Sequence, residues 1–280
     1  MEYVKLVIGV ETDYQEALIA ELFDMDFNGF EQQQDRIITY IARENFEDQI
    51  REQINQLLSS YPGNGFIESE EVIADQNWNR QWEETIRAQT IGQFFVEPTW
   101  SVEKTPEDKI LLKIDPKMSF GTGYHETTRL VLKLLPDIIR DGDMVIDAGT
   151  GTGILAIASI KLGAKYALAF DIDDWSISNA RENVGLNDVA DFITVKKGST
   201  DVIPKGEKAD VLLANIERNT IIELLHDFVK ALKLNGHLVL SGLLAKDREE
   251  ILNKLENNFK INGISQENEW IAIHAQKIGT

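Results

Sequence analysis

A buried strand that runs directly into a glycine-rich turn and then a helix is the pattern with the most chemical information. In this turn Gly149, Gly151 and Gly153 alternate with threonines, and Asp147 lies two residues before the first glycine. Glycine allows a tight turn and a close approach of a ligand to the main chain, although such turns also arise from packing alone. A dinucleotide fingerprint, G-x-G-x-x-G, would need a glycine at Ile154 and is not met. We expect the three glycines to bind a cofactor that has no pyrophosphate.

The next strand, Tyr166–Asp171, ends in a carboxylate 22 positions after Gly149. A carboxylate at about this distance hydrogen-bonds the ribose hydroxyls of a bound nucleotide at the tip of the second strand. S-adenosylmethionine is a nucleoside cofactor without a pyrophosphate, and it fits this description. The alternative is that Asp171 caps the following helix, but Asp173 and Asp174 are better placed for that role.

Asn215 ends a later buried strand, Ala209–Asn215, and Glu217 follows two residues on. In open α/β sheets, ligands bind beyond the carboxyl ends of the strands, near the point where the strand order reverses. Asn215 would offer its amide oxygen there to an incoming nucleophile, so we predict it as both a catalytic and a cofactor-binding residue. The alternative is that this asparagine only forms a turn.

Residues 115–129 form a second glycine-containing segment that leads into a helix. This segment lacks the Gly-Lys-Ser/Thr ending of a phosphate-binding loop. Thr127 and Thr128 open the helix, so either hydroxyl could serve as its cap. His125 and Glu126 would suit a metal ion, but no second histidine lies nearby and the chain contains no cysteine. We therefore expect no metal site.

The elements that position these residues begin after a smaller N-terminal domain, residues 1–73. Its pattern predicts strands over Tyr3–Val10, from Phe30, over Ile37–Ala42 and over Phe66–Ile73, and helices after Thr12 or Asp13 and after Asn45. The order β-α-β-β-α-β is the ferredoxin-like α+β motif. Small sheets of this kind often recognise partners, but the fold alone does not decide the role of this domain.

Residues 74–93 are predicted to form a linker, with a helix over Asp75–Ala88 that carries Trp78 and Trp82. Residues 94–280 are predicted to form one domain. From Asp141 onward, short apolar strands alternate with helices, which predicts a doubly wound, Rossmann-like α/β sheet. The predicted strands are Phe94–Val96, Ile110–Ile114, Met144–Asp147, Tyr166–Asp171, Phe192–Lys196, Ala209–Asn215 and His237–Ser241. Two final segments, Lys260–Ile264 and Glu269–Gln276, predict a terminal hairpin, a feature that separates methyltransferase sheets from dinucleotide-binding folds.

Composition narrows the class of protein. The chain has 280 residues, 43% of them hydrophobic, and a formal net charge of −19. Such a charge repels phosphate backbones, so we expect no direct nucleic-acid binding. It favours a basic protein or an amine as partner, although acidity can also serve solubility alone. No apolar run suits a membrane span and the start lacks a secretory signal, so a cytoplasmic protein is expected.

Taken together, these segments resemble the ribosomal protein L11 methyltransferase family, and the resemblance covers nearly the whole chain. It includes residues 77–82, 98–100, 120–128, 147–153, 162–164, 171–173, 214–216 and 241–244. The glycine loop is shared by many methyltransferases. The segment from Phe120 to Thr128, combined with Ala214-Asn215-Ile216, is far more specific.

The resemblance implies a class I methyltransferase domain that uses S-adenosylmethionine to methylate lysine side-chain and N-terminal amines of a large-subunit ribosomal protein. The cofactor contacts would come from Thr128, Gly149, Asp171 and Asn215, and the loop closing over the cofactor would contain Phe120, Gly121 and Thr122. The N-terminal domain would bind the ribosomal protein, and the chain is expected to act as a monomer. The sequence departs from the family's usual pattern at Thr150 and Thr152 in the glycine loop and at Glu217, where an apolar residue is usual.

Three other functions remain open or are disfavoured. A methyltransferase acting on a small-molecule amine would share the whole cofactor site. A binding module with a vestigial cleft is opposed by the intact glycines, Asp171 and Asn215. An NAD-dependent oxidoreductase is opposed by Ile154 and by the lack of an identifiable Tyr/Lys proton relay.

Overall fold

The computed structural model describes residues 3–61, 63, 65–73, 86–117 and 119–279. The chain folds into two compact units, residues 1–78 and 79–280, and each is described by itself. None of the helices formed by the described residues is long and apolar enough to cross a membrane.

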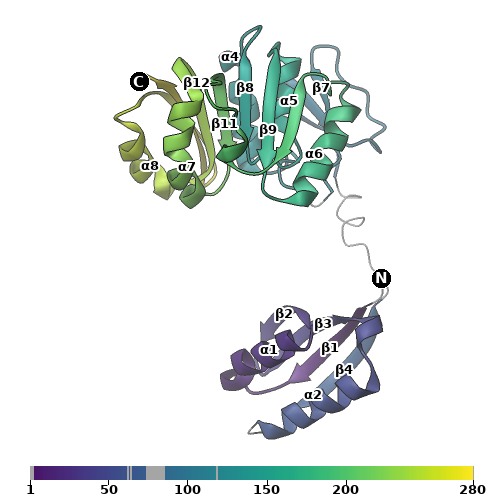
Figure 1. Ribbon diagram of the computed structural model, residues 1–280. Helices are drawn as coiled ribbons and strands as arrows, with labels where there is room; N and C mark the ends of the chain where they lie inside the picture. Colours follow the sequence, from purple (N-terminus) through teal and green to yellow (C-terminus); the bar gives the residue numbers. More distant parts are fainter. Residues whose placement is uncertain (1–2, 62, 64, 74–85, 118, 280) are drawn as a thin grey trace. The chain divides into compact units, whose positions relative to one another are not determined.

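The N-terminal unit is a four-stranded antiparallel sheet packed against two helices, which confirms the ferredoxin-like prediction (Figure 1). Its elements are β1 (Tyr3–Gly9), α1 (Gln15–Asp24), β2 (Asn28–Gln33), β3 (Arg36–Ala42), α2 (Asp48–Ser60) and β4 (Phe66–Ile73), in the sheet order β2-β3-β1-β4. The alternation in β1 buries Val4, Leu6 and Ile8 beneath apolar side chains of both helices, among them Leu18 and Ile54.

Both helices of this unit begin later than their sequence signals suggest. A 3₁₀ turn over Thr12–Tyr14 precedes α1, and the Thr12 hydroxyl donates a hydrogen bond to Asp35 Oδ1 at 3.2 Å instead of capping the helix. A second 3₁₀ turn, Arg43–Asn45, likewise precedes α2. The first helix therefore does not begin after Thr12 or Asp13, nor the second directly after Asn45, because short polar side chains serve turns as readily as helix starts.

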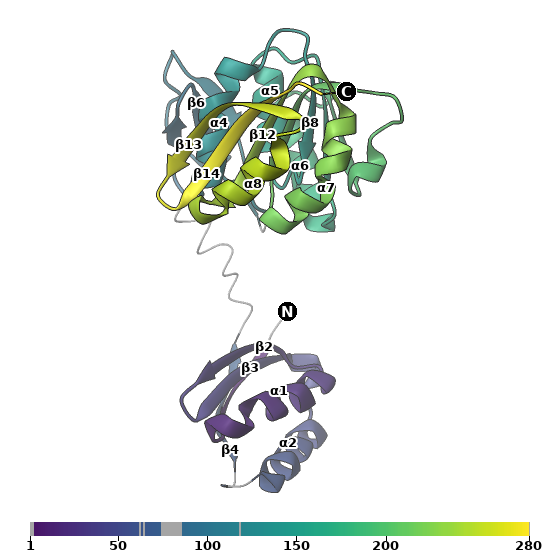
Figure 2. The same ribbon diagram turned by 90° about the vertical axis from the view of Figure 1, so that its left-hand side faces the viewer.

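The C-terminal unit contains a seven-stranded sheet of order β10-β9-β8-β11-β12-β14-β13. Six of these strands run in the same direction, and β14 runs in the opposite one. Its strands are β8 (Met144–Ala148), β9 (Tyr166–Asp171), β10 (Ile193–Lys197), β11 (Ala209–Asn215), β12 (Leu232–Leu244), β13 (Phe259–Glu267) and β14 (Trp270–Lys277). The predicted doubly wound sheet and terminal hairpin are thus confirmed, and Figure 2 shows the β13–β14 hairpin at the sheet edge.

Helices cover both faces of this sheet. They are α4 (Glu126–Ile138), α5 (Ile154–Lys161), α6 (Asp174–Leu186), α7 (Arg218–Ala231) and α8 (Arg248–Leu255). The first three share one hydrophobic core with alternate sheet residues such as Val145 and Leu213. The other two share the core on the opposite face with Ile146 and Leu212. Successive side chains of each buried strand therefore pack alternately into the two cores.

A small three-stranded sheet precedes α4. It consists of β5 (Gln89–Ile91), β6 (Phe94–Glu97) and β7 (Ile110–Lys113). The last two confirm predicted strands. Residues 86–88, at the end of the predicted linker helix, are not helical, and β5 follows them directly. Most of the predicted linker helix, including Trp78 and Trp82, lies outside the described residues.

Candidate functional site

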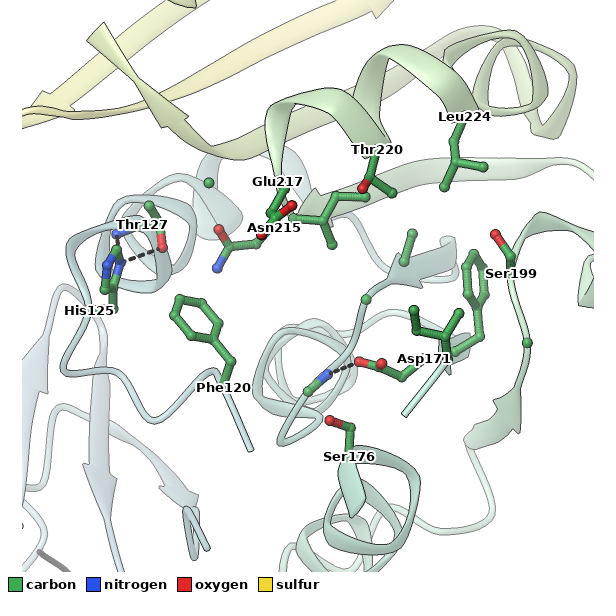
Figure 3. Close-up of a pocket in the computed structure, with 18 of the residues that line it drawn as sticks. Phe120, His125, Thr127, Asp171, Ser176, Ser199, Asn215, Glu217, Thr220 and Leu224 are labelled. Atoms are coloured by element: carbon green, nitrogen blue, oxygen red, sulfur yellow. Dashed lines mark hydrogen bonds between the residues drawn. The ribbon is translucent and has the colours of Figure 1, made fainter. Parts of the chain in front are cut away.

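A cavity of about 630 Å³ lies at the carboxyl ends of β8, β9 and β11 (Figure 3). The strand order reverses here, because β9 and β10 extend the sheet to one side of β8 while β11 and β12 extend it to the other. Such a reversal is where open α/β sheets bind ligands. The cavity is lined by Phe120, His125, Thr127, Ala148, Gly149, Gly151, Phe170, Asp171, Ile172, Ser176, Gly198, Ser199, Asn215, Ile216, Glu217, Thr220, Leu224, Gly242 and Trp270.

The glycines around this cavity allow neighbouring loops to interlock. A Cβ on Gly149 would overlap the Ile216 side chain, and a Cβ on Gly151 would overlap the carbonyl oxygen of Phe120. A Cβ on Gly242, within β12, would overlap the backbone of Ile216 from the other side. All three glycines have positive φ, which L-residues with a side chain adopt only with strain. Close packing of protein on protein, as well as access for a ligand, therefore requires glycine here.

Asp171 lies at the tip of β9 and lines the cavity, as predicted. Its two carboxylate oxygens accept hydrogen bonds from the backbone N–H of Gly151 at 3.0 Å and of Asp173 at 3.1 Å. The helix cap is Asp173, which accepts a bond from Ser176 N at 2.8 Å. The alternative reading of Asp171 as a cap is thus wrong. Each carboxylate oxygen has a further lone pair that can accept a hydrogen bond from a ligand.

Asn215 ends β11 and its side chain is 9% exposed. Its Nδ2 donates a hydrogen bond to Thr128 Oγ1 at 3.3 Å, which fixes the rotation of the amide. Its Oδ1 is buried and has no partner among the described residues (Figure 3). A buried acceptor without a donor is unfavourable by roughly 1–3 kcal/mol, so this oxygen is suited to receive a hydrogen bond from a ligand.

His125 is a site residue that the sequence analysis considered only for metal binding. It caps α4, because its Nδ1 accepts a hydrogen bond from Thr127 N, so the expected caps Thr127 and Thr128 are instead inside the first turn. Its ring lies between Phe120 and Trp270, with centroid distances of 5.1 and 4.7 Å. The only sequence signal for its role as a helix cap was its position directly before an amphipathic helix. Nothing local connects it with Trp270.

The remaining predicted residues lie behind the cavity lining. Thr128 is fully buried and reaches the site through Asn215. Gly153 precedes α5 in a left-handed conformation against Ala180, and the Gly121 carbonyl accepts a bond from Thr152 Oγ1 at 2.6 Å.

Thr122, the last of the predicted cofactor residues, is also absent from the lining; its Oγ1 accepts a hydrogen bond from Tyr124 N at 3.3 Å. Phe120, Gly149, Gly151, Asp171 and Asn215 do line the cavity. Sequence reasoning missed Ser176, Ser199, Thr220, Gly242 and Trp270, which belong to other strand ends and helices. No group of three or more metal-ligating side chains occurs among the described residues.

Asp147, which is completely buried, stabilises the glycine turn after β8 through hydrogen bonds. Its Oδ2 accepts hydrogen bonds from Thr150 Oγ1 at 2.6 Å and from Ala156 N at 3.2 Å, while its Oδ1 has no partner in the described chain. Burial raises the pKa of the Asp147 carboxyl to about 6, the two hydrogen bonds lower it, and the charge of Asp171 adds to the rise.

The cavity is acidic. Its lining residues include the carboxylates of Asp171 and Glu217, and none of the lining residues found in the described chain is lysine or arginine. A pyrophosphate would have no side-chain cation to pair with in this lining. A cationic ligand would be attracted to it.

Comparisons with known proteins agree with this geometry. The model of the ribosomal protein L11 methyltransferase family matches residues 7–278. A ribosomal protein L11 methyltransferase of Thermoanaerobacter pseudethanolicus is 38% identical over 207 residues, covering 73% of this chain and 66% of that protein. One of Caldicellulosiruptor saccharolyticus is 32% identical, covering 99% of this chain and all of that protein. A crystal structure of a ribosomal protein L11 methylase from Lactobacillus delbrueckii subsp. bulgaricus is 30% identical with a TM-score of 0.64, covering 69% of this chain and 100% of that one.

We expect Gly242→Ala to be more destabilising than Gly142→Ala. Both glycines have positive φ, but a Cβ on Gly142 has no atom within 4 Å, whereas one on Gly242 overlaps the Ile216 backbone. Gly142→Ala should therefore lose only about 1–2 kcal/mol through backbone strain, and Gly242→Ala roughly 1–3 kcal/mol more through overpacking. Urea unfolding followed by tryptophan fluorescence would measure both, since residues 3–73 contain no tryptophan. Equal losses would show that the interlocking of the loops is unimportant.

We also expect Asp147 to make stability depend on pH. The folded chain binds the Asp147 proton more tightly than the unfolded chain, whose carboxyl keeps the ordinary pKa of 3.8. The free energy of unfolding should therefore fall as the pH rises from about 4 to 6, by about 3 kcal/mol relative to Asp147→Asn, which does not ionise. Unfolding curves of both proteins between pH 4 and 7 test this. A constant difference across that range would contradict it.

Proposed function

The chain belongs to the ribosomal protein L11 methyltransferase family, and on this premise we propose that it transfers the methyl group of S-adenosylmethionine to amines of ribosomal protein L11. The acceptors in this proposal are lysine side chains and the N-terminal amine. The observation that carries it is the pairing, in one acidic cavity, of a carboxylate at the tip of β9 with the unpartnered Oδ1 of Asn215 at the tip of β11.

The residues present fit this cofactor. The Asp171 carboxylate has the position expected for a ribose-binding group, and the turn at Gly149 and Gly151 leaves the main chain open to the cavity. An acidic lining without side-chain cations suits a sulfonium and would not suit a dinucleotide. When bound, S-adenosylmethionine supplies a methyl carbon that its sulfonium has already activated. The chain itself must hold, orient and desolvate the acceptor amine.

The acceptor must lose its proton before it can act as a nucleophile. A lysine amine has a pKa of about 10.4, so its neutral form costs roughly 4.6 kcal/mol at pH 7, whereas an N-terminal amine near 7.8 costs only about 1 kcal/mol. Correct positioning can contribute roughly 7–11 kcal/mol at best, which exceeds both values. A strong side-chain base is therefore unnecessary. In this proposal Asn215 Oδ1 accepts a hydrogen bond from the amine and orients it, while solvent takes the proton.

The N-terminal unit supports a basic protein as the substrate. Residues 1–73 contain 16 acidic and 4 basic residues, a larger imbalance for its size than in the rest of the chain. Charge of this kind steers the approach of a positively charged partner and disfavours nucleic acid. We propose that this unit recognises the ribosomal protein and that the chain acts as a monomer in the cytoplasm.

The direct test is to incubate the full chain with methyl-labelled S-adenosylmethionine and a ribosomal extract. The proposal expects label in ribosomal protein L11. Label only in small molecules would favour the small-molecule methyltransferase. The absence of label despite cofactor binding would favour a non-enzymatic module.

Asp171→Ala should weaken S-adenosylmethionine binding by about 1.5–3 kcal/mol, the typical loss for hydrogen bonds to a charged group. Isothermal titration calorimetry measures this directly. Asp174→Ala is the matched control, because it removes the same charge nearby. The Asp174 carboxylate is 2.6 Å from Lys197 Nζ, and Asp174 is not among the residues that line the cavity. Unchanged binding in Asp171→Ala would exclude Asp171 from the site.

Asn215→Ala should lower the single-turnover methylation rate by about 100-fold, as expected when an acceptor is no longer correctly positioned. The affinity for S-adenosylmethionine should change much less. Thr128→Val, which removes the hydroxyl that holds the Asn215 amide, should lower the rate by a smaller factor, and Thr128→Ser should retain it. Equal losses of rate and cofactor affinity in Asn215→Ala would contradict the orienting role.

A further inference from the structure

Glu217 lines the cavity but has no part in the site described so far. It lies two residues after Asn215 and directly before α7, and its side chain is exposed to solvent. Figure 3 shows it beside Asn215 and on the other side of the cavity from Asp171. Glu217 is thus a carboxylate at the mouth of the cavity, on the side where Asn215 offers its unpartnered oxygen.

The Glu217 carboxylate forms no hydrogen bond or ion pair with any other residue that the structure describes. The adjacent cation, Arg218, is directed elsewhere, and its Nη1 lies 3.2 Å from Asp247 and 3.3 Å from Glu250. No structural partner therefore explains a charged side chain at this position. Its charge is available to a ligand.

The other ionisable groups of the cavity already form hydrogen bonds with the protein. Both oxygens of Asp171 accept backbone hydrogen bonds, and Nδ1 of His125 faces the first turn of α4. Among the ionisable side chains that line the described cavity, only Glu217 combines a negative charge with a place next to Asn215. A positive group entering on this side meets a carboxylate and an amide oxygen together.

We infer that Glu217 captures the protonated primary amine of the substrate and so determines the preference of the acceptor site for cationic groups. This inference rests on the proposed amine methylation. A lysine amine with a pKa near 10.4 arrives as an ammonium ion, which a carboxylate attracts. Because the carboxylate stabilises the charged form, and only the neutral form reacts, Glu217 contributes to capture and not to the methyl-transfer step.

The test compares Glu217→Gln, which keeps the shape and removes the charge, with Glu223→Gln. Glu223 lies on the same helix, is also exposed and does not line the cavity, so it removes an equal charge without touching the site. With ribosomal protein L11 as acceptor at low salt, Glu217→Gln should raise KM about two- to fivefold, the range for an exposed ion pair. The value of kcat should not fall, because the lost interaction stabilised the unreactive charged form of the amine, and the calorimetric affinity for S-adenosylmethionine should stay the same. The difference in KM should shrink in 0.5 M salt.

Two outcomes would overturn the inference: equal KM values for Glu217→Gln and the unsubstituted protein, or an equal rise in KM for Glu223→Gln. A fall in kcat without a change in KM would also overturn it, because that result would assign Glu217 to the chemical step. These failures are distinct from failure of the proposed function, in which the unsubstituted protein would not methylate ribosomal protein L11 at all.

Discussion

The loops at the carboxyl edge of the large sheet must approach one another more closely than a Cβ atom allows, and the rest of the site depends on this constraint. Ile216 is held between Gly149 and Gly242, two glycines on either side of β11 in the sheet. Asn215 directly precedes Ile216, so the same packing that positions Ile216 also positions the amide. The glycines thus define the shape of the cavity as much as they open it to a ligand.

Hydrogen bonds, as well as packing, hold the residues of the site in position. Asp147 joins the glycine turn to the start of α5, and Thr128 fixes the side-chain orientation of Asn215 from a neighbouring helix. Each arrangement leaves one buried oxygen, Asp147 Oδ1 or Asn215 Oδ1, without a partner in the part of the chain that the structure describes. The two differ in exposure to the cavity, since Asn215 lines it and Asp147 does not. The Asp147 carboxyl is therefore a buried group whose desolvation raises its pKa, whereas Asn215 Oδ1 is an acceptor beside the cavity.

The two carboxylates that line the cavity, Asp171 and Glu217, differ in their surroundings. Asp171 is tied to backbone N–H groups at the tip of β9, whereas Glu217 stands without a partner in the described chain beside β11. In the proposed reaction both the sulfonium of the methyl donor and the protonated amine are cations, which suits a lining whose described residues include no lysine or arginine. An aromatic group formed by Phe120, His125 and Trp270 lies along the same cavity.

The sequence alone determined the elements and the glycine-rich turn, because strand periodicity and glycine turns are encoded within a few neighbouring residues. The ferredoxin-like order, the doubly wound sheet, the terminal hairpin and the positions of Asp171 and Asn215 at strand ends could all be predicted in this way. Only the tertiary structure decided which distant residues meet. Thr128 pairs with Asn215 across 87 positions, and His125 contacts Trp270 from the last hairpin. Such contacts follow from the order of strands in the sheet, which brings distant chain segments together. The local sequence pattern of one segment does not indicate which other segment it will contact.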